Sequence, residues 1–472
     1  MKNISLIRCL FAGLFLISAA TVNGQVLTLD AYKQQVQGSD VGWKSVEAEK
    51  RGSQLLQTEA EGLTGILLTS QATFLNDKRP TTNPGFQGSK TENTGFLIGL
   101  KQQTEWGLQW ALTQNFTHTQ IYGASQSTLP VPKFYDAYPK LELSIPLWRN
   151  FLGAEISNQQ EQMSQQSLAR KKQAELAWLQ KQIEIETTYY SLLAQRQLIE
   201  IQKDSIARAD RILQWTKSRI SKNLADSSDI YQSQAAVAAR KMELLNAQKN
   251  LADAISKFNL LRGQNASELT ETLEAPEVNP TLLKLSQTPI KNRRDVELKK
   301  LQNITNDSSH RVQMEKHKPQ LDLSVSTALY GRDTELSKAQ SKVFTDDKDY
   351  LLVALTFNMP LNQFKESDYR EGYAQLSAGQ KLAIEDRQKE QQLLWSNTVE
   401  QAHQLEQQLT VAQELESLQQ KKANAERDKF NRGRSTLFQV LSYEQDYFNA
   451  RSQRINLELG VRQFLSQLSL FE

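Results

Sequence analysis

The stretches Tyr138–Asn150, YPKLELSIPLWRN, and Tyr350–Gln363, YLLVALTFNMPLNQ, share one pattern. In each stretch apolar and polar residues alternate up to a Pro-Leu pair, at Pro146-Leu147 and at Pro360-Leu361. The two prolines lie 214 residues apart, and a long segment with almost no glycine and no proline follows each of them. Alternation with a period of two predicts a β-strand. The sequence therefore predicts an internal duplication in which a strand leads into a long helix.

The segments after the two Pro-Leu pairs predict helical rods. Residues 152–222 contain a single glycine and no proline, and as an unbroken helix they would span about 105 Å. A second rod is predicted at 362–430. A short break ends each rod and a shorter helix follows it, with breaks at 223–228 and 431–435 and return helices at 229–262 and 436–468.

Both rods carry narrow apolar stripes. The first rod has a seven-residue repeat, which is coiled-coil spacing, at Ile185, Leu192, Ile199, Ile206, Leu213 and Ile220. The second rod has two stripes about 130° apart, one of Ala402, Leu405, Leu409 and Ala412 and one of Val411, Leu415 and Leu418. Two narrow seams favour a helix with a neighbour on each side, as in a closed wall of helices. The alternative is an ordinary bundle helix with one wide apolar face.

Six segments alternate with a period of two and are about ten residues long, at 64–75, 94–104, 107–121, 138–147, 321–329 and 350–359. This length and period are typical of transmembrane β-barrel strands, which are apolar toward lipid and polar toward a wet lumen. A soluble sandwich also alternates. The aromatic residues that flank the segments favour the membrane interpretation because they fit interfacial girdles, and they are Trp106, Trp148, Tyr330 and Tyr350.

The start of the 472-residue chain predicts a cleaved secretory signal. The basic residues Lys2 and Arg8 precede the apolar run Cys9–Ala20, and the small residues after this run allow cleavage before Gln25. Cys9 is the only cysteine, so disulfides, thiolate metal sites and cysteine nucleophiles are excluded from the mature protein. With 56 Lys+Arg against 53 Asp+Glu the net charge is +3, which gives no support for binding nucleic acid. The mean hydropathy of −0.56 is too polar for a helical membrane protein.

No catalytic constellation is found in the sequence. The four histidines are scattered, and there is no P-loop, nucleophile elbow or zinc-protease motif. We therefore expect no enzyme, no cofactor and no metal site, including at His118, His310, His317 and His403.

The duplicated halves resemble the TolC family of outer-membrane efflux proteins over nearly the whole mature chain. Ser144-Ile145-Pro146-Leu147 is similar to the family's strand-to-helix junction, and Phe430-Asn431-Arg432-Gly433 is similar to its tip turn. The segment 292–319 resembles the helix before the family's second pair of strands.

The resemblance implies a homotrimer that builds one β-barrel in the lipid of the cell outer membrane and one α-barrel across the periplasm of a Gram-negative envelope. It implies a passive exit duct of a tripartite efflux pump or a type I secretion system. Its partners would be a periplasmic adaptor (membrane fusion) protein and, indirectly, an inner-membrane RND or ABC pump. The alternatives are a non-channel periplasmic coiled-coil protein and the adaptor itself.

The predicted fold class is mainly α with a transmembrane β-barrel part and internally duplicated long helical hairpins. The predicted regions are a signal peptide (1–24), an N-terminal periplasmic helix (25–62), a first strand region (63–148), a first long hairpin (149–262), an equatorial segment and helix (263–319), a second strand pair (320–361) and a second long hairpin (362–472).

The site residues are positional, at the two tips and the two junctions. Matching to the family implies adaptor contact and aperture closure at the tips, where Gly433 suits a left-handed turn and Asp226 and Asp229 would cap the first return helix. Gln439 and Ser442, near the start of the second return helix, are not acidic, so an acidic ring built from both halves is not expected. The tip residues are Asn223, Leu224, Ala225, Asp226, Asp229, Arg432, Gly433 and Arg434, and the junction residues are Pro146, Leu147, Pro360 and Leu361.

Basic residues crowd the rod ends, at Lys217, Arg219, Lys222, Arg427, Lys429, Arg432 and Arg434. They either complement the helix dipoles or lock the helix pairs together and dock an adaptor.

One departure from the family is predicted. Its members usually contribute two strands from each half, whereas four strands fit before Trp148 in this chain, with a tight turn at Glu105-Trp106-Gly107. The hypothesis is six strands for each protomer and eighteen for the trimer, and the alternative is an additional hairpin outside the barrel wall.

Overall fold

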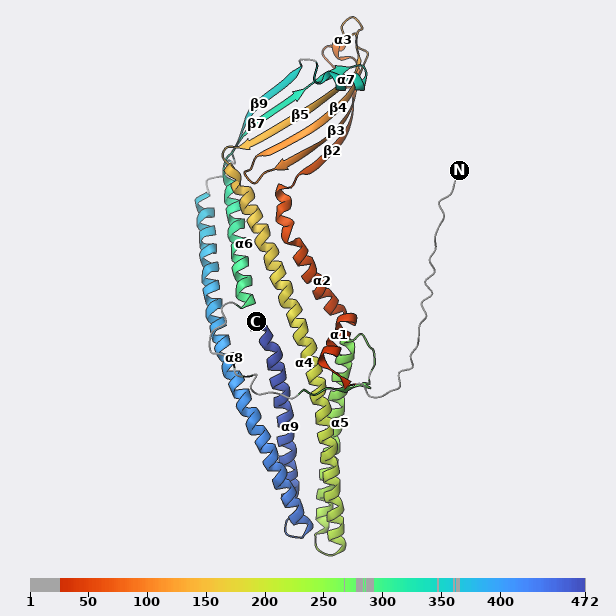
Figure 1. Cartoon of the computed structure of the whole chain (residues 1–472), viewed down its shortest axis with the longest axis vertical. Coiled ribbons are helices and arrows are strands. Elements are labelled where there is room, and N and C mark those ends of the chain that lie inside the picture. The colour runs from red at the N-terminus through yellow and green to blue at the C-terminus, as the bar shows by residue number, and fades with distance from the viewer. Residues whose placement is uncertain are drawn as a thin grey trace, which may run out of the picture. The chain divides into compact units, whose positions relative to one another are not determined.

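The computed structural model describes residues 26–266, 268–276, 283, 285, 293–345, 348–359, 361 and 366–471 (Figure 1). The predicted signal peptide, Pro360 and parts of the equatorial segment lie outside these residues. The chain divides into two compact units. The helical unit comprises Met1–Lys44, Lys181–Leu285 and Gln401–Leu468, and the sheet unit comprises Ser45–Gln180, Ser286–Glu400 and Ser469–Glu472.

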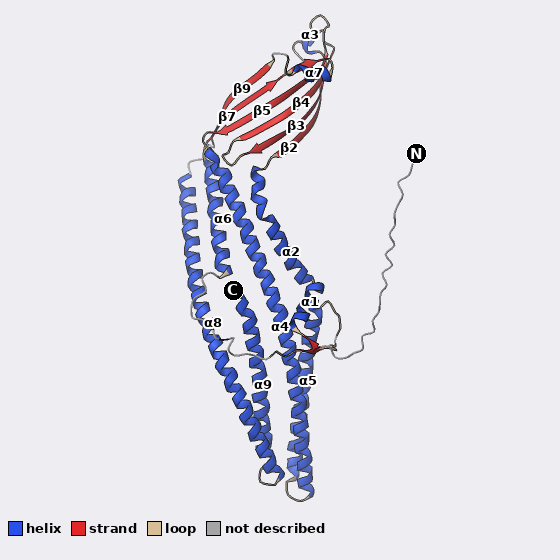
Figure 2. Ribbon diagram, viewed as in Figure 1, coloured by secondary structure: helices blue, strands red, loops and turns tan. Residues whose placement is uncertain are grey.

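The sheet unit is built on one antiparallel sheet with the strand order β2-β3-β4-β5-β7-β9, drawn in red in Figure 2. A short strand, β8, pairs with the outer part of β5. All six predicted strands are confirmed, and β2 and β3 continue the sheet rather than leaving it. The strands are β2 (Leu67–Asp77), β3 (Lys90–Gln103), β4 (Gln109–Tyr122), β5 (Lys133–Pro146), β7 (Gln320–Leu329), β8 (Gly331–Asp333) and β9 (Asp349–Asn358).

The two faces of the sheet differ in polarity. One cross-strand row runs unbroken through all six strands and is apolar except for one threonine, through Leu68, Leu100, Leu112, Leu141, Thr327 and Leu351. The adjacent row lies on the other face and is more polar, through Leu67, Lys101, Ala111, Glu142, Ser326 and Leu352. A hollow of about 580 Å³ lies over the second face. One side of the sheet thus suits lipid and the other suits water.

The loops at the far end of the strands contain two short helices, α3 (Pro84–Gln87) and α7 (Leu336–Lys342). Ala339 and the following Val343 pack on Ala137 of β5, with Phe116 and Tyr135 against the cluster. The loops that contain α3 and α7 are long, whereas the β3–β4 connection is the tight turn that the sequence predicts, at 104–108.

The structure divides the predicted N-terminal helix into three helical elements. The chain forms α1 (Leu29–Ser39), α2 (Val41–Leu55) and a 3-10 helix, η1 (Leu56–Thr64). Asp40 is the cause of the first break, because its backbone is extended and its carboxylate accepts a hydrogen bond from the N–H of Trp43 at 2.8 Å. Asp40 therefore begins a new helix rather than continuing the old one.

The two rods are confirmed as α4 (Ala154–Ser221) and α8 (Glu366–Asn431), and their return helices as α5 (Ser227–Leu261) and α9 (Leu437–Leu468). In the equatorial segment, β6 (Thr272–Leu273) pairs in parallel with β1 (Val26–Leu27). None of the helices in the described ranges has the length and apolar character that a membrane span requires.

Helix α6 (Arg294–His317) of the sheet unit is held to both rods by polar contacts. Ser308 donates a hydrogen bond to Glu161 of α4 at 3.0 Å, and Asp295 pairs with Arg387 of α8 at 2.7 Å. His310 stacks on Tyr373 of α8, with ring centroids 4.6 Å apart.

The heptad stripe of α4 is buried only in part. Ile185, Leu192 and Ile199 are buried, whereas the last three members of the stripe are half-buried. Nearer the end of the helix, the buried apolar residues are Ile201 and Ile212, which are not members of the stripe. A straight α-helix drifts about 20° for each heptad, so a strict seven-residue stripe turns away from one neighbour.

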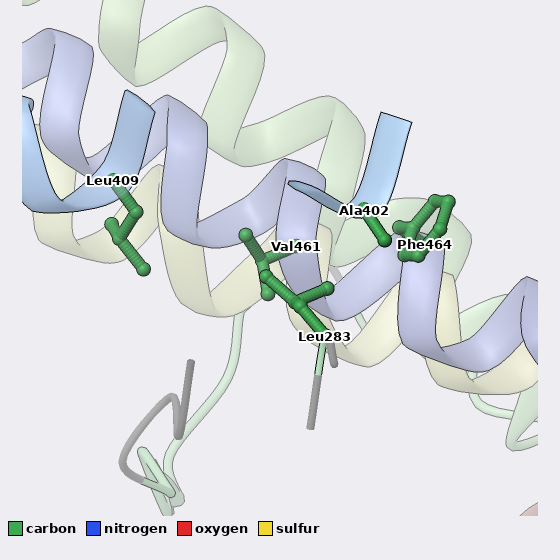
Figure 3. Close-up of a cluster of buried hydrophobic side chains, with 5 residues drawn as sticks. All are labelled: Leu283, Ala402, Leu409, Val461 and Phe464. Atoms are coloured by element: carbon green, nitrogen blue, oxygen red, sulfur yellow. The ribbon is translucent and has the colours of Figure 1, made fainter. Parts of the chain in front are cut away.

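The two stripes of α8 have different environments. Ala402, Leu409 and Ala412 are buried, and Figure 3 shows Ala402 and Leu409 beside Val461 and Phe464 of α9 and Leu283. The second stripe is exposed in the protomer, with exposed fractions of 61%, 37% and 54% for Val411, Leu415 and Leu418. Within the protomer one seam of α8 is therefore covered and the other is open, and a neighbour for the second seam stays a prediction.

Candidate functional sites

The turns at the ends of the two rods have the same geometry. In the first turn, the N–H of Leu224 donates to the carbonyl of Arg219 at 2.8 Å and that of Asn223 donates to Ile220 at 2.9 Å. In the second, Arg434 donates to Lys429 at 2.8 Å and Gly433 to Phe430 at 3.0 Å. This paired pattern is a Schellman ending, which requires a left-handed residue. Asn223 (φ 57°) and Gly433 (φ 75°) provide it at equivalent positions of the duplication.

The predicted tip residues lie together at each turn and are largely exposed to solvent. Asn223, Leu224 and Asp226 are exposed in the first turn, and Arg432, Gly433 and Arg434 are exposed in the second. Ala225 and Asp229 are half-buried. The predicted side-chain cap is wrong for Asp226, which occupies the N-cap position of α5 without a capping hydrogen bond from its side chain. Its carbonyl accepts the N–H of Asp229 at 3.1 Å instead.

Arg219 connects the two tips. Its guanidinium donates to the carbonyls of Phe430 and Ser435 at 3.3 and 3.4 Å, and to that of Leu224 at 3.2 Å. The guanidinium carbon also lies 4.6 Å from the centre of the Phe430 ring. Of the basic residues at the rod ends, this one serves as a polar lock between the two hairpins.

A second polar link between the hairpins was missed by the sequence reasoning. The Glu444 carboxylate of α9 is buried 3.6 Å from Arg427 of α8 and 3.8 Å from Arg208 of α4. Burial raises the pKa of Glu444, against the opposing effect of the two guanidinium groups. The available signal was spacing, because Val440, Glu444 and Tyr447 share one buried stripe of α9.

The first strand-to-helix junction is a compact turn. Pro146 ends β5, and the N–H of Leu147 donates to the carbonyl of Leu321 at 2.7 Å. A 3-10 turn, η2 (Phe151–Gly153), then leads into α4. Asn150 has a left-handed backbone, and its side-chain oxygen caps α4 by accepting the N–H groups of Glu155 and Ile156 at 2.9 and 3.2 Å.

The β3–β4 turn packs directly on this junction. A Cβ atom on Gly153 would lie 1.7 Å from the carbonyl oxygen of Glu105, and one on Gly107 would lie 2.8 Å from that of Asn150. Both glycines have positive φ. At the second junction Leu361 is exposed, and Pro360 lies outside the described residues.

The histidines form no metal site in the described part of the chain, where no group of three potential ligands is close enough to hold an ion. His310 and His317 stack on Tyr373 and Tyr369 instead.

Comparison with solved structures identifies the architecture. VceC, an outer membrane protein of Vibrio cholerae, superposes with a TM-score of 0.63 at 13% identity, over 94% of this chain and 95% of that chain. The outer-membrane channel OprN superposes with a TM-score of 0.64 at 14% identity, over 94% and 89%. The chain has the TolC-like fold. The open state of the MtrE outer membrane channel of Neisseria gonorrhoeae matches less well, with a TM-score of 0.56 at 10% identity over 94% and 88%. No protein-family model and no curated protein sequence matches the chain.

Within the TolC-like fold, the duplication relates the two tip turns and the two junctions. The structure brings the tip residues together at equivalent positions and joins the tips through Arg219. Contact with an adaptor and closure of an aperture stay predictions for these residues.

Proposed function

We propose that the protein is a trimeric outer-membrane channel-tunnel that serves as the exit duct of a tripartite efflux pump or a type I secretion system. In this proposal the sheet lies in the outer membrane of a Gram-negative envelope and the helices cross the periplasm. The duct is passive, and an inner-membrane RND or ABC pump supplies the energy through a periplasmic adaptor.

The sheet carries the proposal. It has six strands with one largely apolar face and one more polar face, and it stays open in a single chain. In lipid an open edge leaves backbone groups without partners, at a cost of several kcal/mol for each group. Closure therefore requires strands from other copies, and cyclic symmetry supplies them.

The helical unit supports association independently. The exposed stripe of α8 (Val411, Leu415 and Leu418) is matched by exposed apolar residues on one face of α5, which are Tyr231, Met242 and Leu245. Large exposed apolar faces on helices mark association surfaces. In a ring of three copies, α8 of one copy packs on α5 of the next and covers both faces.

The tips and the first junction have distinct roles in this proposal. The exposed apolar side chains Leu224 and Phe438 at the tips provide the contact with the adaptor. The half-buried Asp229 and the exposed Arg434 influence the aperture by their charges. The junction residues Pro146 and Leu147 set the direction in which α4 leaves the barrel.

The test is expression of the full chain with its predicted leader, followed by separation of the envelope membranes and reconstitution into planar bilayers. We expect a trimer in the outer-membrane fraction and discrete conductance steps. A protein that stays a lone subunit in detergent and never fractionates with the outer membrane would refute the proposal. That result would favour the periplasmic coiled-coil alternative. An adaptor is disfavoured by the duplicated rods and by the amphipathic sheet.

A further inference from the structure

We propose that β2 of one copy pairs with β9 of the next copy, so that three copies close a barrel of eighteen strands. The inference rests on the proposed function, because it needs three copies around a shared barrel. It concerns the part of the chain that departs from the TolC family pattern, namely the two strands added before Trp148.

The strand order makes β2 and β9 the two edges of the sheet. They are of similar length, eleven and ten residues. Every neighbouring pair along the path is antiparallel, so an even number of strands leaves β2 and β9 running in opposite directions. Pairing between copies is then antiparallel as well, as in bacterial outer-membrane barrels.

The added strands are a fixed part of the sheet. β3 pairs with β4 along its whole length, from Lys90 opposite Tyr122 to Gln103 opposite Gln109. Its turn is also wedged against the strand-to-helix junction, where Gly153 leaves no room for a side chain beside Glu105. A hairpin outside the wall would have to break this ladder and this contact.

The apolar and polar faces of the added strands, β2 and β3, are those expected of strands in the barrel wall. The largely apolar row of the sheet begins at Leu68 of β2 and Leu100 of β3 before it reaches β4. Phe96 and Ile98 of β3 lie on the same face and are exposed. A hairpin projecting into water would gain nothing from such residues.

The stagger of the strands has the value that a barrel needs. A row that starts at the first residue of β2, Leu67, reaches Leu352 of β9, six residues before the end of that strand at Asn358. Six residues of about 3.4 Å each give an offset of about 20 Å along the strand direction. The five steps between neighbouring strands, of about 4.8 Å each, give a distance of about 24 Å across the sheet. The ratio of these two lengths corresponds to a tilt of the strands of about 40° from the barrel axis. This tilt lies within the range of about 35–45° for outer-membrane barrels.

The same tilt fixes the width of the barrel. Eighteen strands give a backbone diameter of about 36 Å, against about 24 Å for twelve. The register between β9 of one copy and β2 of the next follows from two conditions. The offset for each step must be the same as within the sheet, and the more polar faces of the two strands must lie on the same side. These conditions place Asn358 opposite Leu67 or Thr69 of the neighbouring copy. Ala354 on the more polar face then lies opposite Gln71 or Thr73 of the neighbouring copy.

Cysteine pairs test this register, because Cys9 in the predicted leader is the only native cysteine. Directly opposed antiparallel residues lie within disulfide distance. We expect Ala354→Cys combined with Gln71→Cys or with Thr73→Cys to give covalent dimers and trimers upon oxidation in outer membranes. The matched control is Ala354→Cys with Thr113→Cys of β4, which crosslinks only if β4 is the edge of the protomer's wall.

The outcomes separate the two proposals. Crosslinking through Thr113, or no crosslinking through β2 in a protein that is trimeric in the outer membrane, overturns the β2–β9 pairing and leaves the channel proposal intact. Absence of a trimer in the outer membrane overturns the channel proposal itself. Because a double variant can fail to assemble, the strands around the pore of the unmodified trimer are also counted in an electron density map. Eighteen strands support the inference, and twelve overturn it.

Discussion

Serine in place of Val411, Leu415 and Leu418 tests whether the exposed stripe of α8 is an interface between copies. Complete burial of such a side chain is worth about 1.5–3 kcal/mol. Since about half of their combined surface is still exposed in the protomer, about 1 kcal/mol for each residue remains to be gained on association. The triple variant should lose about 3 kcal/mol at each interface, which is roughly a hundredfold in its association constant.

The assay is the temperature at which the detergent-solubilised trimer converts to monomer, read on a gel and by sedimentation. We expect the triple variant to dissociate at a clearly lower temperature while its helical circular dichroism at 25 °C stays unchanged. A variant with the same trimer resistance as the unmodified protein would show that this stripe faces water in the assembly.

Leu409→Ala is the matched control on the same helix. Leu409 is completely buried against α9 within the protomer, so its truncation should cost about 2–5 kcal/mol of protomer stability. The Leu409→Ala change should lower the free energy of unfolding of the dissociated subunit. The triple serine variant should leave that free energy nearly unchanged.

Three further predictions concern the tips and the junction. Asn150→Ala should lower the free energy of unfolding by about 2 kcal/mol, because it removes the cap of α4 and places an ordinary residue in a left-handed conformation. Asn150→Gly should recover the part of this loss that comes from the left-handed backbone. Glu426 accepts a hydrogen bond from Ser435 at 2.5 Å, which lowers the pKa of Glu426. The ionised Glu426 therefore stabilises the second tip fully at pH values above the ordinary pKa of glutamate. This stabilisation is lost as the pH falls through the lowered pKa of Glu426. The protection of the amides at 431–436 against hydrogen exchange, corrected for the intrinsic pH dependence of the exchange rate, should fall on acidification, and Ser435→Ala should remove that fall. Charge changes at Asp229 or Arg434 should alter the leak of the resting pore in planar bilayers, and unchanged conductance for both would reject a role in gating.

The sequence predicts the regular elements of this fold closely because their signals are local. A period of two over ten residues defines β7 and β9 to within a residue of their ends. The rods are equally well defined, since long segments without proline leave few alternatives to a helix. The break at Asp40 was missed because an N-cap within a helical pattern has the same composition as an exposed helix residue.

Contacts between distant segments could not be predicted in the same way. Arg219 is one of seven basic residues near the rod ends, and nothing in its neighbourhood along the chain marks it as the residue that reaches Phe430 and Ser435. Glu444 was closer to recognition because it lies on an otherwise apolar stripe. Its partners Arg208 and Arg427 come from two other helices, so the identity of the link requires the fold.

The duplication itself supplies an inference that the local pattern lacks. Gly433 is expected to be left-handed from its residue type, whereas Asn223 becomes a candidate only when the two breaks are aligned 210 residues apart. Asparagine tolerates this conformation better than most residues, and the structure gives both turns the same hydrogen bonds. Gly433→Asn should therefore be accepted with little change in stability. Asn223→Val should cost more than 1 kcal/mol, because a branched side chain at positive φ meets the following carbonyl. Equal stability of the two variants in thermal unfolding would mean that the tips are not held in this geometry by their backbone.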